Sequence, residues 1–196
     1  PKATIIDGIE YYTYEWDSRF ATDGDYTFSV SAIDLADNET VDANVSYVNG
    51  EGEDIKTISN AFTVDKTLPI ISVSYDNNTA QNGKYFAKAR IATIVVKEHN
   101  FDVERVDFSA LTASLDKNDI AKPEIKWEHD GNTHTATISF AVDGDYTFDV
   151  KMTDKAANES KDADYGNSVA GKEFVVDLTA PKLDITGVAD KSANNG

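Results

Sequence analysis

The stretch Asp143-Gly144-Asp145-Tyr146-Thr147-Phe148-Asp149-Val150 decides the fold of this chain, because it occurs twice. Residues 23–30 read Asp-Gly-Asp-Tyr-Thr-Phe-Ser-Val and share its first six residues. A second related pair, residues 62–69 and 174–181, reads Phe-Thr-Val-Asp-Lys-Thr-Leu-Pro and Phe-Val-Val-Asp-Leu-Thr-Ala-Pro. Each copy therefore shares both a middle and an end with the other. Self-similarity of this kind indicates a tandem array of small modules.

The length and composition favour all-β modules. A chain of 196 residues holds about one complete domain and part of another. Short runs of Val, Ile, Thr, Tyr and Phe alternate with Asp-Gly and Asn-Gly turns, which is typical of strands and tight turns. We expect residues 1–66 to be the C-terminal part of one module, residues 67–178 a complete module, and residues 179–196 the first strand of a third.

The charge and the missing cysteines exclude several classes of function. A net charge of −17 argues against binding to nucleic acid, which requires clustered Lys and Arg, and against anionic membrane surfaces. With no cysteine, the chain forms neither disulfides nor zinc thiolates. No apolar run approaches the ~20 residues of a membrane span. Because the chain begins and ends inside repeats, we expect any targeting or anchoring signal to lie outside it.

Seven alternating segments are expected in the complete module. Apolar residues at every second position indicate half-buried strands, and seven short strands of this spacing indicate a two-sheet sandwich with Greek-key connections. The expected inward positions are Ile71, Val73 and Tyr75; Ala92, Ile94 and Val96; Ala136, Ile138 and Phe140; Tyr146, Phe148, Val150 and Met152; and Phe174 and Val176. Two further strands are expected near residues 103–111 and near residues 123–128, the latter around Ile125 and Trp127.

The repeated stretch has the layout of an immunoglobulin tyrosine corner, in which a Tyr stands two residues before the inter-sheet Cys. Tyr146 and Tyr26 occupy the corner position, and Phe148 and Phe28 stand where the Cys would be. A core Phe contributes ~3–5 kcal/mol, about as much as a disulfide. We therefore expect an aromatic plug between the sheets in place of a disulfide.

The motifs resemble those of bacterial Ig-like domains, which occur in tandem on surface proteins of Gram-positive bacteria. The resemblance rests on Asp-Gly-Asp-Tyr-Thr-Phe, on residues 153–158 (Thr-Asp-Lys-Ala-Ala-Asn) with their counterpart 33–38, on the Phe-Thr-Val-Asp-Lys-Thr-Leu-Pro ending, and on residues 90–102. It implies tandem immunoglobulin-like β-sandwiches, the first one incomplete. Such modules serve as stalks, spacers, adhesins and accessory domains, so the resemblance does not select an activity.

Acidic residues at the module junction are candidate calcium ligands. In an immunoglobulin module, the loop after the sixth strand lies near the end of the preceding module, which would bring Asp154 and Asn158 toward Asp65. Their hard oxygen donors suit calcium. The alternative is that Asp154 and Asn158 cap their own tight loop as an Asx turn. We expect no other cofactor.

No catalytic constellation is recognisable. None of the three histidines, His99, His129 and His134, forms a metal-binding pair at helical spacing, and no carboxylate pair has a recognisable glycosidase arrangement. We expect no enzyme activity. Tyr11, Tyr12, Tyr14 and Trp16 have the composition of a sugar-binding platform. The repeat alignment places Tyr14 and Trp16 on an inward face, so we expect these two to pack in a core.

These observations favour a non-catalytic spacer or stalk in a bacterial cell-surface or secreted multidomain protein. Its first partners would be the neighbouring modules of the same chain. The alternative is an adhesion or carbohydrate-binding module that recognises an extracellular glycan or protein. The incomplete module and the extra strand at residues 180–187 also predict strand exchange between copies of the chain.

Overall fold

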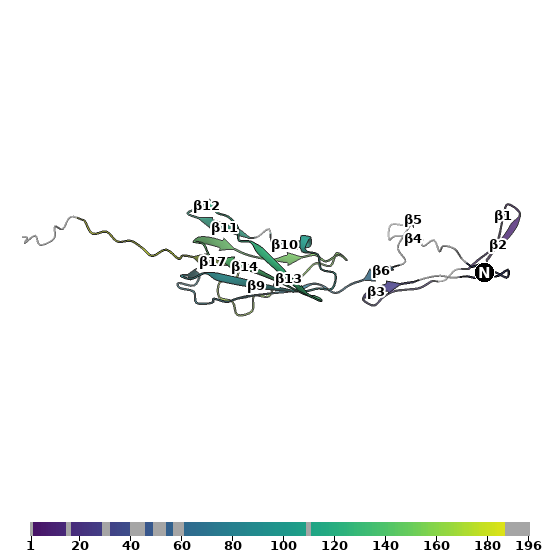
Figure 1. Cartoon of the computed structure of the whole chain (residues 1–196), viewed down its shortest axis with the longest axis horizontal. Coiled ribbons are helices and arrows are strands. Elements are labelled where there is room, and N and C mark those ends of the chain that lie inside the picture. Colours follow the sequence, from purple (N-terminus) through teal and green to yellow (C-terminus); the bar gives the residue numbers. More distant parts are fainter. Residues whose placement is uncertain are drawn as a thin grey trace, which may run out of the picture. The chain divides into compact units, whose positions relative to one another are not determined.

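The computed structural model describes residues 2–14, 17–28, 32–39, 46–48, 54–56, 61–108 and 111–186 (Figure 1). The chain divides into two compact units, Pro1–Thr67 and Leu68–Gly196. The described secondary structure is strand throughout, apart from one turn of 3₁₀ helix, η1 (Val103–Arg105). Among the described residues, no helix is long and apolar enough to span a lipid bilayer.

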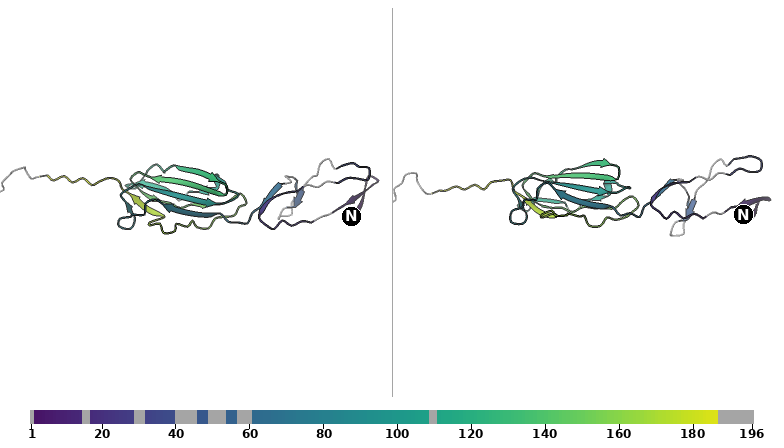
Figure 2. Two further views of the ribbon diagram at one scale, coloured as in Figure 1. Left: turned by 60° about the horizontal axis from the view of Figure 1, so that its bottom comes forward. Right: turned by 90° about the horizontal axis from the view of Figure 1, so that it is seen from below.

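The second unit is a sandwich of two sheets, and Figure 2 shows its strands in two layers. One sheet has the order β13-β14-β9-β7 and the other the order β12-β11-β15-β17-β8. If β7, β9, β11, β13, β14, β15 and β17 are lettered A, B, C, D, E, F and G, these are the D-E-B-A and C-F-G sheets of an immunoglobulin fold. The strands are β7 (Ile70–Tyr75), β8 (Tyr85–Phe86), β9 (Arg90–Lys97), β10 (Val106–Asp107), β11 (Thr112–Leu115), β12 (Asn118–Asp119), β13 (Ile125–Asp130), β14 (Thr133–Phe140), β15 (Gly144–Thr147), β16 (Lys151–Met152) and β17 (Glu173–Val176).

The core of the second unit is built from the residues that alternate along these strands. In β7, β9, β14 and β17 every second side chain is buried, and its neighbours face outward or are half-buried. The buried set contains the inward positions expected from the sequence: Ile71, Val73, Tyr75, Ala92, Ile94, Val96, Ala136, Ile138, Phe140, Tyr146, Phe148, Val150, Met152, Phe174 and Val176. Period-two patterning thus determined which face of each strand is buried.

The expected third strand is displaced along the chain. In place of one strand over residues 103–111, the structure has η1, then the short β10, then β11. The cause is local, because the Asp102 carboxylate accepts a hydrogen bond from the Glu104 backbone N–H and caps a 3₁₀ turn where a strand was expected. The apolar periodicity does not reveal a capping interaction of this kind.

The first unit contains three described strand pairs. A hairpin joins β1 (Lys2–Ile6) to β2 (Ile9–Thr13), β3 (Gly24–Thr27) pairs with β6 (Ala61–Val64), and β4 (Ser46–Val48) pairs with β5 (Asp54–Lys56). The β3–β6 pair has the same register as β15–β17 in the second unit, with Tyr26 opposite Phe62 as Tyr146 is opposite Phe174. The two copies therefore share this part of the fold.

The prediction that Tyr14 packs in a core is wrong, since its side chain is 78% exposed. Ile5, Ile6 and Ile9 of the preceding β1–β2 hairpin are also exposed. The repeat alignment assumed that a second sheet would cover this hairpin, and the sheets described in the first unit each contain two strands. Trp16 lies outside the described residues.

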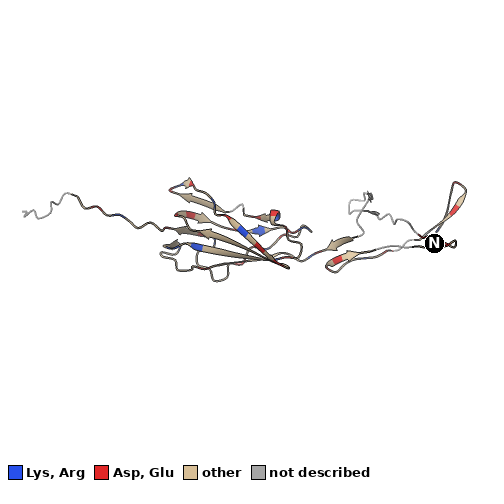
Figure 3. Ribbon diagram, in the orientation of Figure 1, with Lys and Arg blue, Asp and Glu red and all other residues tan. Residues whose placement is uncertain are grey.

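Charged residues do not gather on one strand of the second unit. Figure 3 shows acidic and basic residues spread over several of its strands. Its described ion pairs, such as Lys84 with Glu173 and Lys126 with Glu124, lie on the surface. Exposed pairs of this kind contribute ~0–1 kcal/mol each, so they affect solubility more than stability.

Candidate functional site

The repeated Asp-Gly-Asp-Tyr stretch forms the same corner in both units. The Tyr146 hydroxyl donates to the Val142 carbonyl at 2.8 Å, and the Tyr26 hydroxyl donates to the Thr22 carbonyl at 2.7 Å. Burial raises the pKa of Tyr146. Gly144 is required by close packing, because a Cβ there would lie 2.8 Å from Ile120 Cδ1 and 3.1 Å from the Ser114 carbonyl oxygen.

The first aspartate of the stretch holds the chain where it leaves each unit. Asp143 accepts hydrogen bonds from the Leu178 backbone N–H at 2.6 Å and from the Thr179 hydroxyl. In the first unit, Asp23 accepts a hydrogen bond from the Thr67 hydroxyl at 2.7 Å. We call each of these interactions an exit clasp. Because a proline follows two residues after each clasped threonine, the clasp and the proline both restrict the start of the linker.

Electrostatics favour the ionised form of both clasp aspartates. The hydrogen bond from Thr179, followed by that from the Leu178 backbone, lowers the pKa of Asp143 below its ordinary value. The hydrogen bond from Thr67 does the same for the pKa of Asp23, with smaller contributions from Lys66. A carboxylate that accepts several hydrogen bonds is stabilised in its charged form. The exit clasp is therefore stronger when the carboxylate is ionised.

Two of the candidate calcium ligands, Asp154 and Asn158, lie together and hold each other. Asp154 Oδ1 accepts from the Asn158 backbone N–H at 2.9 Å, and Asp154 Oδ2 accepts from Asn158 Nδ2 at 2.8 Å. Asp34 and Asn38 make the same two bonds at 2.9 and 2.7 Å. The arrangement is a side-chain-capped turn, which is the alternative that the sequence left open for these two residues.

The third candidate ligand, Asp65, caps its own linker. Its Oδ1 accepts from the Thr67 backbone N–H at 2.9 Å, as Asp177 Oδ1 accepts from the Thr179 N–H at 3.2 Å. Asp65 belongs to the first unit and Asp154 to the second. A calcium ion bound by Asp65, Asp154 and Asn158 together stays a prediction.

The aromatic positions singled out by the repeat differ in burial. Phe148 is 1% exposed and its ring lies near the rings of Phe108, Phe140 and Tyr165, 6.2–6.3 Å away between centroids. Phe28 of the first unit is half-buried. Trp127 is half-buried, and its ring centroid lies 5.1 Å from that of Phe101. An aromatic cluster thus occupies the space between the sheets of the second unit.

Sequence reasoning missed Arg90, which is fully buried at the start of β9. Its guanidinium carbon lies 3.6 Å above the Tyr75 ring centroid, 4.2 Å from that of Phe86 and 4.7 Å from that of Phe174. Burial lowers the pKa of Arg90. The guanidinium donates to the carbonyls of Asn77, Val169 and Ala170, and to Asn78 Oδ1. Arg90 lies two residues before Ala92 and therefore on the same face of the strand as Ala92, Ile94 and Val96. This spacing was the sequence signal that could have predicted its burial.

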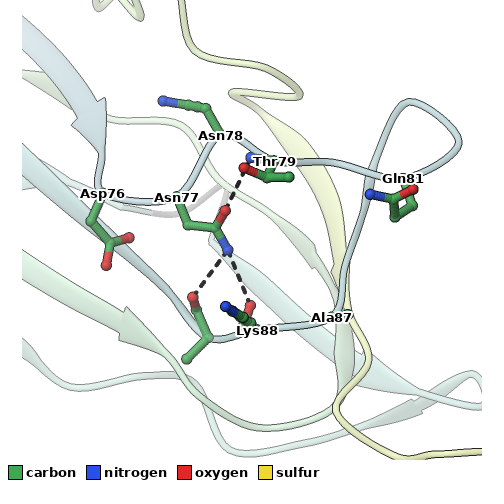
Figure 4. A pocket seen from close by; sticks show the side chains of 8 residues that line it. Asp76, Asn77, Asn78, Thr79, Gln81, Ala87 and Lys88 are labelled. Atoms are coloured by element: carbon green, nitrogen blue, oxygen red, sulfur yellow. Dashed lines mark hydrogen bonds between the residues drawn. The ribbon is translucent and has the colours of Figure 1, made fainter.

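A hollow of about 500 Å³, lined mostly by residues of polar type, lies beside this residue, between residues 76–81 and 87–89. Figure 4 shows the Asn77 side chain between the two segments. Asn77 Oδ1 accepts from the Thr79 N–H at 3.0 Å, and Asn77 Nδ2 donates to the carbonyls of Lys88 and Ala89 at 3.5 and 3.4 Å. Asn77 therefore connects the two walls of the hollow, which gives this side chain a structural role.

Comparisons with known proteins yield little. No protein-family model and no curated protein matches the chain. Two similar solved structures are BcpA, the major pilin subunit of Bacillus cereus, and a variant of that subunit, each with 14% sequence identity and a TM-score of 0.21. The matches cover 79% and 74% of this chain, and 55% and 51% of the pilin chains, so the chain spans about half their length. At this TM-score the likeness carries no argument, and the fold assignment rests on the strand order.

Proposed function

We propose that the chain is part of a non-catalytic spacer in a bacterial cell-surface or secreted protein. In this role, Ig-like modules follow one another and hold another domain at a distance. Each module has to control the direction in which the chain leaves it. The observation that supports the proposal is the exit clasp, which both copies build from the same residue types, Asp23 with Thr67 and Asp143 with Thr179.

The clasp is placed where a spacer needs it. It couples the turn before β15 to the residues that follow β17, and β15 and β17 are adjacent antiparallel strands of one sheet. Asp143 therefore fixes the first linker residues onto the rigid part of the module. A short linker with a proline and a fixed start behaves as a semi-rigid connection, unlike a Gly/Ser-rich linker.

The proposal is tested by measuring the spread of distances between the two units. The natural chain contains no cysteine, so spin labels can be attached at Thr27→Cys and Thr137→Cys, both exposed positions on strands. In pulsed electron paramagnetic resonance, we expect Thr67→Val to broaden the distance distribution. Thr63→Val is the matched control, because it removes another exposed Thr–Asp hydrogen bond, to Asp25 at 2.6 Å, away from the exit. Equal widths in Thr67→Val and in the parent would reject the proposed role of the clasp.

A further inference from the structure

Two histidines face each other across the β13–β14 hairpin. Gly131 and Asn132 form its two-residue turn, and the antiparallel register places His129 opposite His134. The two Nδ1 atoms lie 2.9 Å apart. His134 is 7% exposed, whereas His129 is exposed to solvent. The sequence spacing gave no helical metal pair, but residues five apart across a two-residue turn become neighbours on one face.

The surroundings of His134 fix its ring and its tautomer. His134 Nε2 lies 2.9 Å from the Glu98 carbonyl oxygen. A carbonyl oxygen only accepts hydrogen bonds, so Nε2 carries the hydrogen, and the neutral ring presents a lone pair on Nδ1. Phe101 stacks on the same ring with the centroids 3.9 Å apart. Histidines that bind metals are oriented in this way, with the second ring nitrogen donating to a carbonyl or carboxylate.

We infer that His129 and His134 form a binding site for a divalent transition-metal ion, with Cu²⁺ and Ni²⁺ preferred. In the absence of metal, His129 Nδ1–H donates to His134 Nδ1. The ion takes the place of this shared hydrogen, and the proton moves through water to the exposed Nε2 of His129. The rings point at one another, with centroids 5.1 Å apart, so the exposed His129 ring turns to direct its lone pair at the ion.

The separation of the two nitrogens selects the class of metal. Metal–imidazole bonds are about 2.0–2.1 Å long, so nitrogens 2.9 Å apart subtend an angle of about 90° at the ion. That angle suits the square-planar and tetragonal geometries of Cu²⁺ and Ni²⁺, whereas tetrahedral Zn²⁺ requires a wider nitrogen–metal–nitrogen angle. Water completes the coordination sphere. The net charge of −17 raises the local concentration of any cation.

Copper titration of the full chain tests the site, with calorimetry to measure affinity and electron paramagnetic resonance to identify the ligands. We expect one Cu²⁺ per chain with nitrogen coordination, and His129→Gln to weaken binding about tenfold or more. His129 is exposed, so this variant should keep the fold. His99→Gln is the matched control, because it removes a histidine whose Nδ1 lies 3.2 Å from Asn132 Oδ1 in the hairpin turn and not at the His129–His134 pair, and it should bind as the parent does.

Three outcomes would overturn the inference. These are the absence of copper binding, equal affinity in His129→Gln and in the parent, and a spectrum with oxygen ligands only. The last result would assign the ion to the acidic surface of the chain. None of these results bears on the proposed spacer role, which depends on the exit clasp.

Discussion

At the scale of single residues, the guanidinium of Arg90 joins parts of the second unit that are far apart in sequence. It lies on the rings of Tyr75 and Phe174 and binds the carbonyls of Val169 and Ala170, so the loop before β17 is attached to the strand pair β7–β9. The desolvation of a buried charge is offset here by four hydrogen bonds and by cation–π contacts.

Replacement of Arg90 should be strongly destabilising. We expect Arg90→Met to cost ~3 kcal/mol or more, because it removes four hydrogen bonds donated by a charged group, and hydrogen bonds to charged groups contribute ~1.5–3 kcal/mol each. Arg90→Lys should lose less stability than Arg90→Met, because it keeps the positive charge. It should still be less stable than the parent, since an ammonium group cannot reproduce the planar set of donors of a guanidinium. Urea unfolding followed by NMR signals of the second unit would measure both. Lys84→Met removes only an exposed ion pair, and a loss as large as that of Arg90→Met would contradict this account.

Phe148 and Tyr146 should differ in their contributions to stability. Phe148→Ala opens a cavity between the sheets and should cost ~3–5 kcal/mol. Tyr146→Phe loses only the hydrogen bond to the Val142 carbonyl, worth ~1 kcal/mol. Urea midpoints in the reverse order would show that Phe148 does not replace the inter-sheet disulfide.

At the scale of structural elements, the exit clasp makes the end of the module sensitive to acid. The folded pKa of Asp143 lies below its unfolded value. The stabilisation is therefore fully present above the ordinary carboxyl value, about 3.9, and is lost as the pH falls through the folded pKa. The lowering comes from the hydrogen bonds that Thr179 and Leu178 donate, and desolvation opposes it.

Removal of the threonine hydroxyl should shift this titration. We expect Thr179→Val to raise the pKa of Asp143 toward its ordinary value, because the largest cause of the lowering is lost. Carboxyl ¹³C NMR across acidic pH would measure the pKa. Thr137→Val, at an exposed position in the middle of β14, serves as the control. An unchanged Asp143 titration in Thr179→Val would be incompatible with the clasp.

The loop after β16 should depend on Asp154 with or without calcium. Asp154→Ala removes the two hydrogen bonds that the Asn158 N–H and side-chain amide donate to this carboxylate, at a cost of ~1–3 kcal/mol. Thermal unfolding in chelator and in calcium would measure it, with the exposed Asp162→Ala expected to change stability by less than ~0.5 kcal/mol. If the loss appears only with calcium present, the predicted ion held by Asp65, Asp154 and Asn158 becomes the better explanation.

The strands were largely predictable from the sequence, and the interactions that connect them were less so. Alternation gave the buried faces of β7, β9, β14 and β17, because a one-residue slip would expose an entire apolar face. Arg90 followed that alternation, but a charged residue is expected on the surface. Its burial depends on partners that are distant in sequence, which the alternation does not reveal. The clasp of Asp143 and Thr179 depends on the β15–β17 register, although both residues belong to the repeated motifs.

At the scale of the whole molecule, the chain carries apolar side chains that its own modules leave uncovered. Leu183 and Ile185 are 85% and 80% exposed, and they repeat the pattern of the buried Ile71 and Val73. The hairpin of β1 and β2 also exposes isoleucines. An extended apolar segment and an uncovered hairpin suit association by strand addition.

Strand exchange between copies should therefore appear at high concentration. We expect light scattering to show a mass that rises with concentration, and expect Leu183→Asp with Ile185→Asp to abolish the rise, as deletion of residues 180–196 should. Asp184→Asn is the control, because it leaves both apolar side chains in place. A monomer at every concentration would exclude this association.

The parallel pairing of β8 with β17 predicts how this edge of the second unit responds to mechanical force. β8 follows the first strand and β17 is the last, and they are joined by hydrogen bonds from Val175 N to the Lys84 carbonyl and from Asp177 N to the Phe86 carbonyl, 2.9 and 3.0 Å long. A pull on the two ends of the module slides these strands along each other. These two hydrogen bonds are then loaded in shear and at the same time, instead of opening one by one, so extraction of the last strand requires both to break together.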